Sequence, residues 1–158
     1  MPPAGWTGRV VSIHIAPARG APTTPVDDVR AVPAKGLHGD RHFGRASNAP
    51  GGARPDREIT LIEIEAIEAL ERDYGVSLSP GDTRRNIVTR GVALNHLVGR
   101  EFTVGEVTLR GIRLCEPCAH LASLTHEKVR DGLVHRGGLR AQILTEGVVR
   151  TGNTILAR

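Results

Sequence analysis

One stretch, Leu114-Cys115-Glu116-Pro117-Cys118-Ala119-His120-Leu121, contains both cysteines of the 158-residue chain. Upstream of it, apolar residues alternate with polar ones from Val107 to Leu114, which predicts a half-buried strand. Downstream of it, apolar residues follow helical spacing until Asp131-Gly132, which predicts a helix. The two cysteines are therefore expected at the junction between a strand and a helix.

Cys118 is the first candidate for a functional residue. Pro117 suits the first position of a helix, where its missing N–H costs nothing, so Cys118 is expected in the first turn. Unpaired backbone N–H groups and the positive end of the helix dipole favour a thiolate at that position, whereas a nearby Glu116 would oppose it. The alternative interpretation is that both cysteines are small buried hydrophobic residues.

The composition limits the kind of protein. A chain of 158 residues suits one domain spanning residues 1–158, and an aromatic content of 3% predicts an aliphatic core. Lys and Arg outnumber Asp and Glu by 21 to 17, and Lys35 and Lys128 are the only lysines. The planar guanidinium of arginine suits carboxylates and phosphates, which favours an anionic small molecule as a ligand. We expect no nucleic-acid partner, because few aromatics are available for stacking and the basic residues are scattered among acidic ones.

The sequence also indicates where the protein works. No apolar run approaches the roughly 20 residues of a membrane span, so no membrane partner is expected. The segment Met1-Pro2-Pro3-Ala4-Gly5 lacks the charged and apolar regions of a signal peptide. A cytoplasmic location follows, and in that compartment a Cys-x-x-Cys pair is more often catalytic, redox-active or metal-binding than a permanent disulfide.

A glycine-rich turn precedes a long irregular segment. His38, Asp40 and His42 lie among turn glycines, and they form either a set of metal ligands or a polar turn on the surface. Turn glycines with Asp are common, so the spacing alone favours the polar turn. Residues 43–57 show no apolar periodicity, which predicts a flexible loop or a lid.

Two further segments carry basic residues beside turns. Arg85 and Asn86 precede a short strand, where they either hold a phosphate or a carbonyl-rich ring or cap loop carbonyls. Gly137 and Gly138, within Arg136-Gly137-Gly138-Leu139-Arg140, either let a phosphate approach backbone N–H groups or form a Gly-Gly hairpin, which is the commoner explanation.

The order of elements predicts a mainly β chain with two or three helices. We expect strands at 8–15, 26–32, 83–89 and 141–144, and a hairpin at 98–107 that turns at Gly105-Glu106. Residues 147–156 are expected to close the chain with a turn and a strand. Thr60-Leu61-Ile62-Glu63 matches a capping box and predicts a helix that ends at Gly75. Strands and helices do not alternate regularly, so we expect an α+β fold with a closed or partly open β-barrel rather than a doubly wound sheet.

Five motifs occur in a fixed order along the chain: Gly36-Leu37-His38-Gly39-Asp40-Arg41-His42, the helix after Ile59, Arg85-Asn86-Ile87 with Gly91-Val92, Pro117-Cys118, and Arg136-Gly137-Gly138 through Gly147 and Gly152. In this order and spacing the set resembles the MOSC domain, the C-terminal module of molybdenum cofactor sulfurases. The resemblance extends from the first predicted strand to the last. It implies a fold rich in β-barrel structure, and it associates the chain with the molybdenum cofactor (molybdopterin) and with sulfur transfer.

The resemblance also implies roles for individual residues. In relatives the cysteine of the Pro-Cys pair carries a sulfane sulfur or ligates molybdenum, and this role of catalytic residue and metal ligand falls on Cys118. Arg85 and Asn86 match positions near the pterin and its phosphate. The remaining residues of the predicted cofactor-binding set are His38, Asp40, His42, Arg136, Gly137, Gly138 and Arg140.

The implied activity has two forms. As an oxidoreductase component, the chain would use the cofactor to reduce N-hydroxylated substrates with separate redox partners. As a sulfur transferase component, it would carry a persulfide and work with cofactor-biosynthesis proteins. The pyridoxal-phosphate half of a full sulfurase is missing from this sequence, so pyridoxal phosphate is not expected in this domain. Cys115 departs from the family pattern and adds a disulfide or persulfide-resolving role to the alternatives.

Two rival interpretations use both cysteines. A zinc site would combine Cys115, Cys118, His120 and His126, although His120 follows Cys118 too closely to share a tetrahedron easily. A dithiol redox module would use the two cysteines alone, although thioredoxin-like proteins need an alternation of strands and helices that is missing here.

Overall fold

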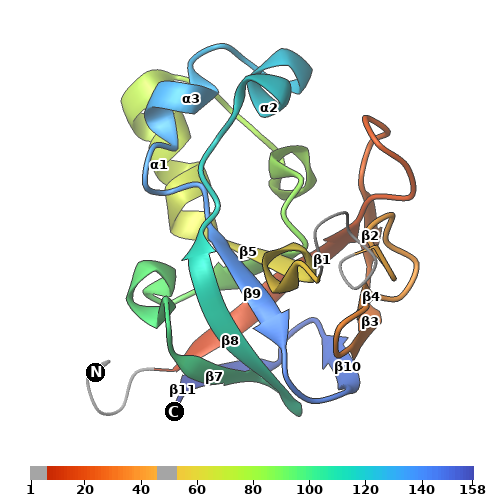
Figure 1. Cartoon of the computed structure of the whole chain (residues 1–158). Coiled ribbons are helices and arrows are strands. Elements are labelled where there is room, and N and C mark those ends of the chain that lie inside the picture. Colours follow the sequence, from red (N-terminus) through yellow and green to blue (C-terminus); the bar gives the residue numbers. More distant parts are fainter. Residues whose placement is uncertain (1–6, 46–52) are drawn as a thin grey trace.

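The computed structural model describes residues 7–45 and 53–158, and most of its regular structure is β-sheet (Figure 1). The strands are β1 (Gly8–Ile15), β2 (Thr24–Val26), β3 (Asp28–Val32), β4 (Gly36–Leu37), β5 (Ile59–Glu63), β6 (Ile87–Arg90), β7 (Glu101–Val104), β8 (Val107–Leu114), β9 (Leu139–Ile143), β10 (Gly147–Arg150) and β11 (Thr154–Ala157). The helices are α1 (Ile64–Tyr74), α2 (Ala119–Leu124) and α3 (Val129–Gly132), with short 3-10 turns η1 (Pro55–Arg57), η2 (Pro80–Thr83) and η3 (Leu94–Leu97).

The strands β11, β7, β8, β9, β5, β6 and β1 form a closed barrel, because β11 pairs with β7 on one edge and with β1 on the other. The pairs are antiparallel except for β5 and β6, which are parallel and are joined through α1. Closure removes the open edges that an exposed sheet would present. The predicted mainly β fold with a barrel is therefore confirmed, and the barrel is closed rather than partly open.

The inside of the barrel is aliphatic, as the low aromatic content predicts. One side of each barrel strand points inward, and the buried side chains there include Ile13, Leu61, Leu109 and Ile155, together with the single aromatic Phe102. Buried and half-buried residues alternate along β9 in the same way. Burial of these aliphatic side chains is the main source of stability for such a fold.

The first helix starts later than the sequence predicts. Residues Ile59–Glu63 form the buried strand β5, and α1 begins at Ile64 without a side-chain cap at Glu63, so the predicted capping box is wrong. The apolar side chains of this segment are taken into the barrel sheet, and tertiary packing overrides the local capping preference. The predicted end is confirmed: Gly75 adopts the left-handed conformation with φ 68° and closes the helix.

The predicted second helix is two short helices, α2 and α3, which lie with α1 at one end of the barrel (Figure 1). Leu121 of α2 and Val129 and Leu133 around α3 pack against Leu70 of α1, which explains the helical spacing of their apolar residues. No helix in residues 7–45 and 53–158 is long and apolar enough to cross a membrane.

A small sheet of β10, β3 and β4 lies beside the barrel. The strand predicted at 26–32 is interrupted at Asp27, so its first residue belongs to β2, which pairs with β1, and the rest forms β3. The predicted loop or lid at 43–57 includes residues 46–52, which lie outside the described residues. Its described end contains η1, a turn that the absence of apolar periodicity did not predict.

Candidate functional site

The two cysteines have different environments. Cys118 is exposed at the N-cap of α2 with an extended backbone (φ −129°, ψ 171°), whereas Cys115 is 2% exposed, and both thiols are free. Pro117 precedes the N-cap, so its predicted position inside the helix is wrong, and Cys118 lies just before the first turn rather than within it. The buried-hydrophobe interpretation therefore holds for Cys115 alone, and Cys118 is the thiol that a ligand can reach.

Arg85 fixes the segment that carries the cysteines. Its side chain is 8% exposed and donates from Nε to the carbonyl of Gly137 (2.7 Å), from Nη1 to that of Thr83 (3.2 Å) and from Nη2 to that of Cys115 (3.0 Å). Burial lowers the pKa of Arg85, while the nearby cysteines Cys115 and Cys118 raise it. Arg85 therefore caps backbone carbonyls, which was one of its two predicted roles. It acts as a clamp between β6, the cysteine segment (residues 115–118) and the turn before β9.

Asn86 makes a similar set of internal contacts. Its side-chain oxygen accepts hydrogen bonds from the backbone N–H and the hydroxyl of Thr60 (3.0 and 3.1 Å), and its amide nitrogen donates to the carbonyl of His14 (3.1 Å). These bonds connect β1, β5 and β6 at the end of the barrel that α2 covers. Asn86 therefore positions the strands from which the site is built.

Gly137 and Gly138 allow the backbone to pack tightly beside the cysteines. A Cβ on Gly137 would lie 2.3 Å from the carbonyl oxygen of Cys115, and one on Gly138 would lie 2.1 Å from that of Leu61. Gly138 also has a φ of 117°, a backbone conformation that residues with a side chain rarely adopt. The segment leads from α3 into β9 and joins no hairpin, so the Gly-Gly hairpin interpretation is wrong.

Arg140 and Arg136 are separated by the structure. The half-buried Arg140 lies on β9 near Arg85, donates from Nη1 to the carbonyl of Asp56 (3.4 Å) and has a buried Nε without a partner among the described residues. Arg136 is exposed, and its charge acts on Asp73 at the end of α1 and on Glu63. Arg140 thus has a free donor beside the cysteine segment, and Arg136 faces the helices.

The turn with the two histidines is held by its aspartate. Asp40 is buried and accepts hydrogen bonds from the backbone N–H groups of Ala16 (2.8 Å) and His42 (3.2 Å). His38 is exposed and places its ring at an edge-on angle to Phe43, with ring centroids 5.1 Å apart. Burial lowers the pKa of the half-buried His42, and nearby arginines lower it further. These contacts match the polar turn, which was the interpretation that the spacing favoured.

Metal binding by protein side chains alone has no support in the described residues. In residues 7–45 and 53–158, no three His, Cys, Asp or Glu side chains gather closely enough to hold a metal ion. This applies to the turn with His38, Asp40 and His42 and to the rival zinc site with Cys115, Cys118, His120 and His126.

A hydrogen-bonded pair beside Cys118, Glu116 and His135, was missing from the sequence interpretation. The Glu116 carboxylate accepts a hydrogen bond from the backbone N–H of His135 (2.7 Å) and lies 2.7 Å from its Nδ1, while His135 adopts φ 59°. The pair joins the cysteine segment to the turn after α3. The contact spans 19 residues, and no local pattern signals it.

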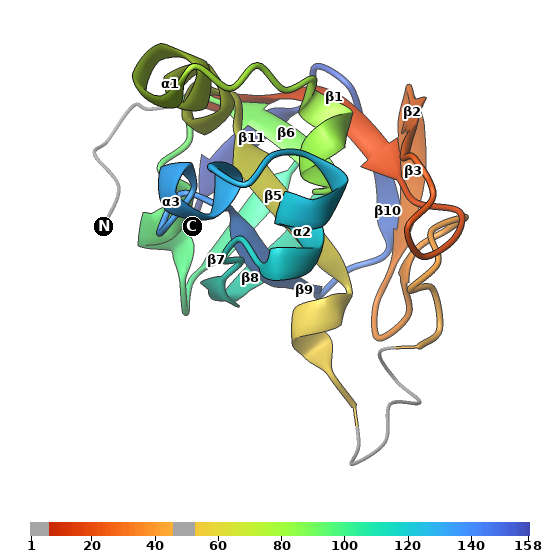
Figure 2. The same cartoon turned by 90° about the horizontal axis from the view of Figure 1, so that it is seen from above.

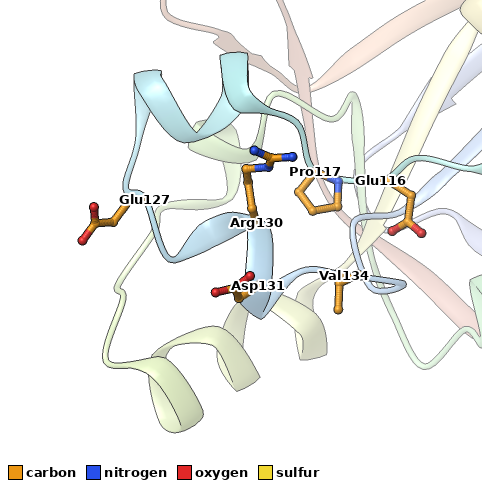
Figure 3. Close-up of a pocket in the computed structure, with 6 residues that line it drawn as sticks. All are labelled: Glu116, Pro117, Glu127, Arg130, Asp131 and Val134. Carbon is orange, nitrogen blue, oxygen red and sulfur yellow. The ribbon is translucent and has the colours of Figure 1, made fainter.

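A cleft lies next to the same segment (Figure 3). It has a volume of about 720 Å³, and its lining residues are Glu116, Pro117, Glu127, Arg130, Asp131 and Val134. In Figure 3, Arg130 points toward Pro117, and Glu127 points away from the other lining residues. The face between the cysteine segment and α3 is therefore hollowed and mostly charged.

The fold and site together define a class. The molecule is a small closed β-barrel with short helices over one end (Figure 2), where one free cysteine is exposed and an arginine clamps its segment. A family model described as "MOSC domain" matches residues 38–156. The chain therefore belongs to the MOSC domain family, which is associated with molybdenum cofactor binding and sulfur-related functions.

Solved structures show the same fold. YuaD from Bacillus subtilis aligns with a TM-score of 0.81 at 20% identity, over 94% of each chain. YiiM from Geobacillus stearothermophilus aligns with a TM-score of 0.73 at 18% identity, over 96% of this chain and 75% of that one. YiiM from Escherichia coli aligns with a TM-score of 0.65 at 17% identity, over 99% of this chain and 70% of that one. A comparison with curated protein sequences finds no match.

Proposed function

We propose that the chain binds the molybdenum cofactor or carries sulfur for it, with Cys118 as the molybdenum ligand or as the carrier of a persulfide. The observation that carries the proposal is the exposure of Cys118 beside the buried, clamped Cys115. A thiolate sulfur is a soft ligand that suits such a metal, and an accessible thiolate is also the form that accepts and transfers sulfur.

The residues around Cys118 fit an anionic pterin. Arg140 is half-buried on β9, and the charge of Arg85 acts on both cysteines. Guanidinium groups are strong partners for phosphate and for carbonyl-rich rings. Arg140 would hold the anionic part of the ligand, Arg85 would hold the cysteine segment in place, and Cys118 would contact the metal or the transferred sulfur.

The cofactor and the protein chain would contribute different parts of the chemistry. The cofactor, when bound, supplies a metal centre for redox chemistry, as cofactors do in general. Cys118 would hold that centre, and the carbonyl contacts of Arg85 keep the segment of Cys118 in place. Reduction of N-hydroxylated substrates would need separate redox partners, and sulfur transfer would need partner proteins of cofactor biosynthesis.

The experiment is purification of the full chain from a host that makes molybdopterin. Bound molybdenum, fluorescent oxidised pterin and cyanide-labile sulfur are measured for the wild type, Cys118→Ala and the matched control Cys115→Ala. Pterin and molybdenum that Cys118→Ala loses and Cys115→Ala retains would support ligation. Cyanide-labile sulfur with the same dependence, without pterin, would support sulfur carriage. Absence of all three from the wild type would refute the proposal.

The same variants test the rivals. A dithiol mechanism predicts that Cys115→Ala abolishes activity as fully as Cys118→Ala does. A zinc site predicts stoichiometric zinc that both variants lose. Cys115 is buried and Cys118 is exposed, and this difference supports neither a dithiol mechanism nor a zinc site shared by the two thiols.

A further inference from the structure

Arginines without carboxylate partners gather on one side of the barrel end that carries α2. The ion pairs of the described residues involve arginines elsewhere, for example Arg30 with Glu146 and Arg90 with Glu68. None of them involves the four residues that we call the arginine rim, which are Arg19, Arg41, Arg45 and Arg84. Within residues 7–45 and 53–158, no carboxylate therefore forms an ion pair with this group of positive charges.

Three segments bring the rim together. The turn between β1 and β2 lies beside the loop after β4 in both Figure 1 and Figure 2. The backbone N–H of Arg41 donates to the carbonyl of Ala16 (2.8 Å), which joins that loop to the turn. From the other side, Arg84 donates from Nη1 to the carbonyl of Ala21, and the hydroxyl of Thr23 donates to the carbonyl of Gly81 (2.8 Å). The rim residues thus come from one compact surface.

The electrostatics of the rim show the missing counter-charge. The Nη2 atom of Arg84 is buried and has no partner among the described residues. The pKa of Arg41 is lowered first by burial, then by the charge of Arg84, and further by Arg19 and Arg45. Asp40 is the one carboxylate that opposes these effects, and both of its oxygens already accept backbone hydrogen bonds. Like charges are therefore held together here with only partial compensation from Asp40, and an anionic ligand would supply the rest.

Other basic residues lie outside the arginine rim, in the direction of Cys118. Arg41 and Arg57 both act on His42, and Asp56, next to Arg57, is close to Arg140. Arg140 in turn lies near Arg85, whose charge reaches Cys118. Basic residues therefore also occur between the rim and the segment of the exposed thiol, although the guanidinium of Arg85 is buried and already donates to backbone carbonyls.

We propose that the arginine rim binds a diphosphate group, as a subsite separate from the site at Cys118. Two linked phosphates carry more negative charge than one and present enough oxygens for several guanidinium groups, each of which can bind in a bidentate manner. Inorganic pyrophosphate and the diphosphate of a nucleotide share this chemistry. The binding of a diphosphate group does not depend on the proposed function. Only the identity of the remainder of the ligand rests on it: a pterin linked to a nucleotide would place its diphosphate on the rim.

Calorimetric titration of the full chain with inorganic pyrophosphate, ADP and orthophosphate, at constant ionic strength, tests the subsite. We expect saturable binding of pyrophosphate and of ADP, and binding of orthophosphate about tenfold weaker or more. Arg41→Gln and Arg19→Gln should each weaken pyrophosphate binding by about tenfold, because each removes a charged hydrogen-bond donor. The side chains of these two residues make no hydrogen bond or ion pair within the described chain, so the variants should fold as the wild type does.

Arg9→Gln is the matched control. Arg9 is exposed at the far end of β1, and its loss lowers the net charge by the same amount. It should change the affinity for pyrophosphate by less than about twofold. An equal loss in Arg9→Gln, binding of orthophosphate as tight as that of pyrophosphate, or tighter binding of a single-stranded oligonucleotide would each overturn the proposal.

Cys118→Ala separates this inference from the proposed function. Retained pyrophosphate binding in that variant, with loss of pterin, molybdenum or labile sulfur, supports both proposals. Pyrophosphate binding by a wild type that contains none of the three supports the rim and refutes the proposed function. A wild type that holds pterin but shows no saturable pyrophosphate binding refutes the rim alone.

Discussion

Arg85 holds a buried positive charge against backbone carbonyls instead of a carboxylate. Its donors reach Thr83, Cys115 and Gly137, which belong to three segments that are far apart in the sequence. The family resemblance places Arg85 near the pterin phosphate, and the structure shows that its guanidinium is already occupied. At the residue scale, Arg85 is a positioning residue, and among the described residues it is the Nε of Arg140 beside the site that lacks a partner.

We expect Arg85→Met to lower the free energy of unfolding by roughly 3 kcal/mol, because it leaves several buried carbonyls without donors. Urea denaturation measures this loss, with the exposed Arg9→Met as a control that should stay near the wild type. In the native state, Cys115 should also react faster with iodoacetamide in the variant, which mass spectrometry detects. An Arg85→Met protein as stable as the control would show that the carbonyl contacts contribute little.

At the element scale, Glu58 connects the barrel to the small sheet. Its carboxylate, immediately before β5, accepts hydrogen bonds from the backbone N–H of Ile143 on β9 (3.1 Å) and of Ala34 between β3 and β4 (3.2 Å). Glu58 is 4% exposed, and burial raises its pKa above 4.5, while the two hydrogen bonds oppose that shift. The folded state therefore binds a proton on Glu58 more readily than the unfolded state does.

This shift predicts a pH dependence of stability. The contribution of Glu58 is fully present below its unfolded pKa near 4.5 and is lost as the pH rises through the raised folded pKa. Glu58→Gln keeps an oxygen that can accept both hydrogen bonds and never ionises. We therefore expect the variant to gain stability relative to the wild type as the pH rises from 4 to 7, in urea denaturation at each pH. Exposed Glu71→Gln should show no such trend, and a parallel trend in both variants would contradict the assignment.

Much of the element order was predictable, because the strands and turns show local patterns. The strand at Gly8–Ile15 and the hairpin of β7 and β8 follow from apolar alternation and from a glycine at the turn. The helix start was mispredicted, because Thr60-Leu61-Ile62-Glu63 satisfies a capping pattern although its apolar residues belong to the barrel. Local preference and tertiary packing disagree there, and packing prevails.

At the scale of the whole molecule, the barrel depends on one seam. β11 joins β1 through the pairs Gly8 with Ile155 and Arg9 with Thr154, and it joins β7 on its other edge. The side chain of Ile155 is fully buried in the barrel, whereas that of its neighbour Leu156 is 43% exposed. The last strand of the chain therefore both closes the sheet and fills its interior.

We expect Ile155→Ala to cost about 3 kcal/mol of unfolding free energy, because it opens a cavity in the barrel interior. Leu156→Ala, on the same strand and the opposite face, should change the stability by less than about 0.5 kcal/mol. Chemical denaturation of the two variants gives both values. Similar losses in the two would mean that the seam is not packed as the structure shows.

By itself, the sequence determined the mainly β class with a barrel, most of the strands, the family resemblance and the choice of Cys118 as the leading site residue. Each of these follows from local alternation, from turn residues or from the order of short motifs. Only the tertiary structure decided that Cys115 is buried and Cys118 exposed, that Arg85 is occupied by carbonyls, and that Arg136 faces α1 while Arg140 keeps a free donor. The physical reason is that burial, hydrogen-bond partners and charge neighbours come from contacts between segments far apart in the chain, such as Arg85 with Gly137, and local sequence patterns carry no information about those contacts.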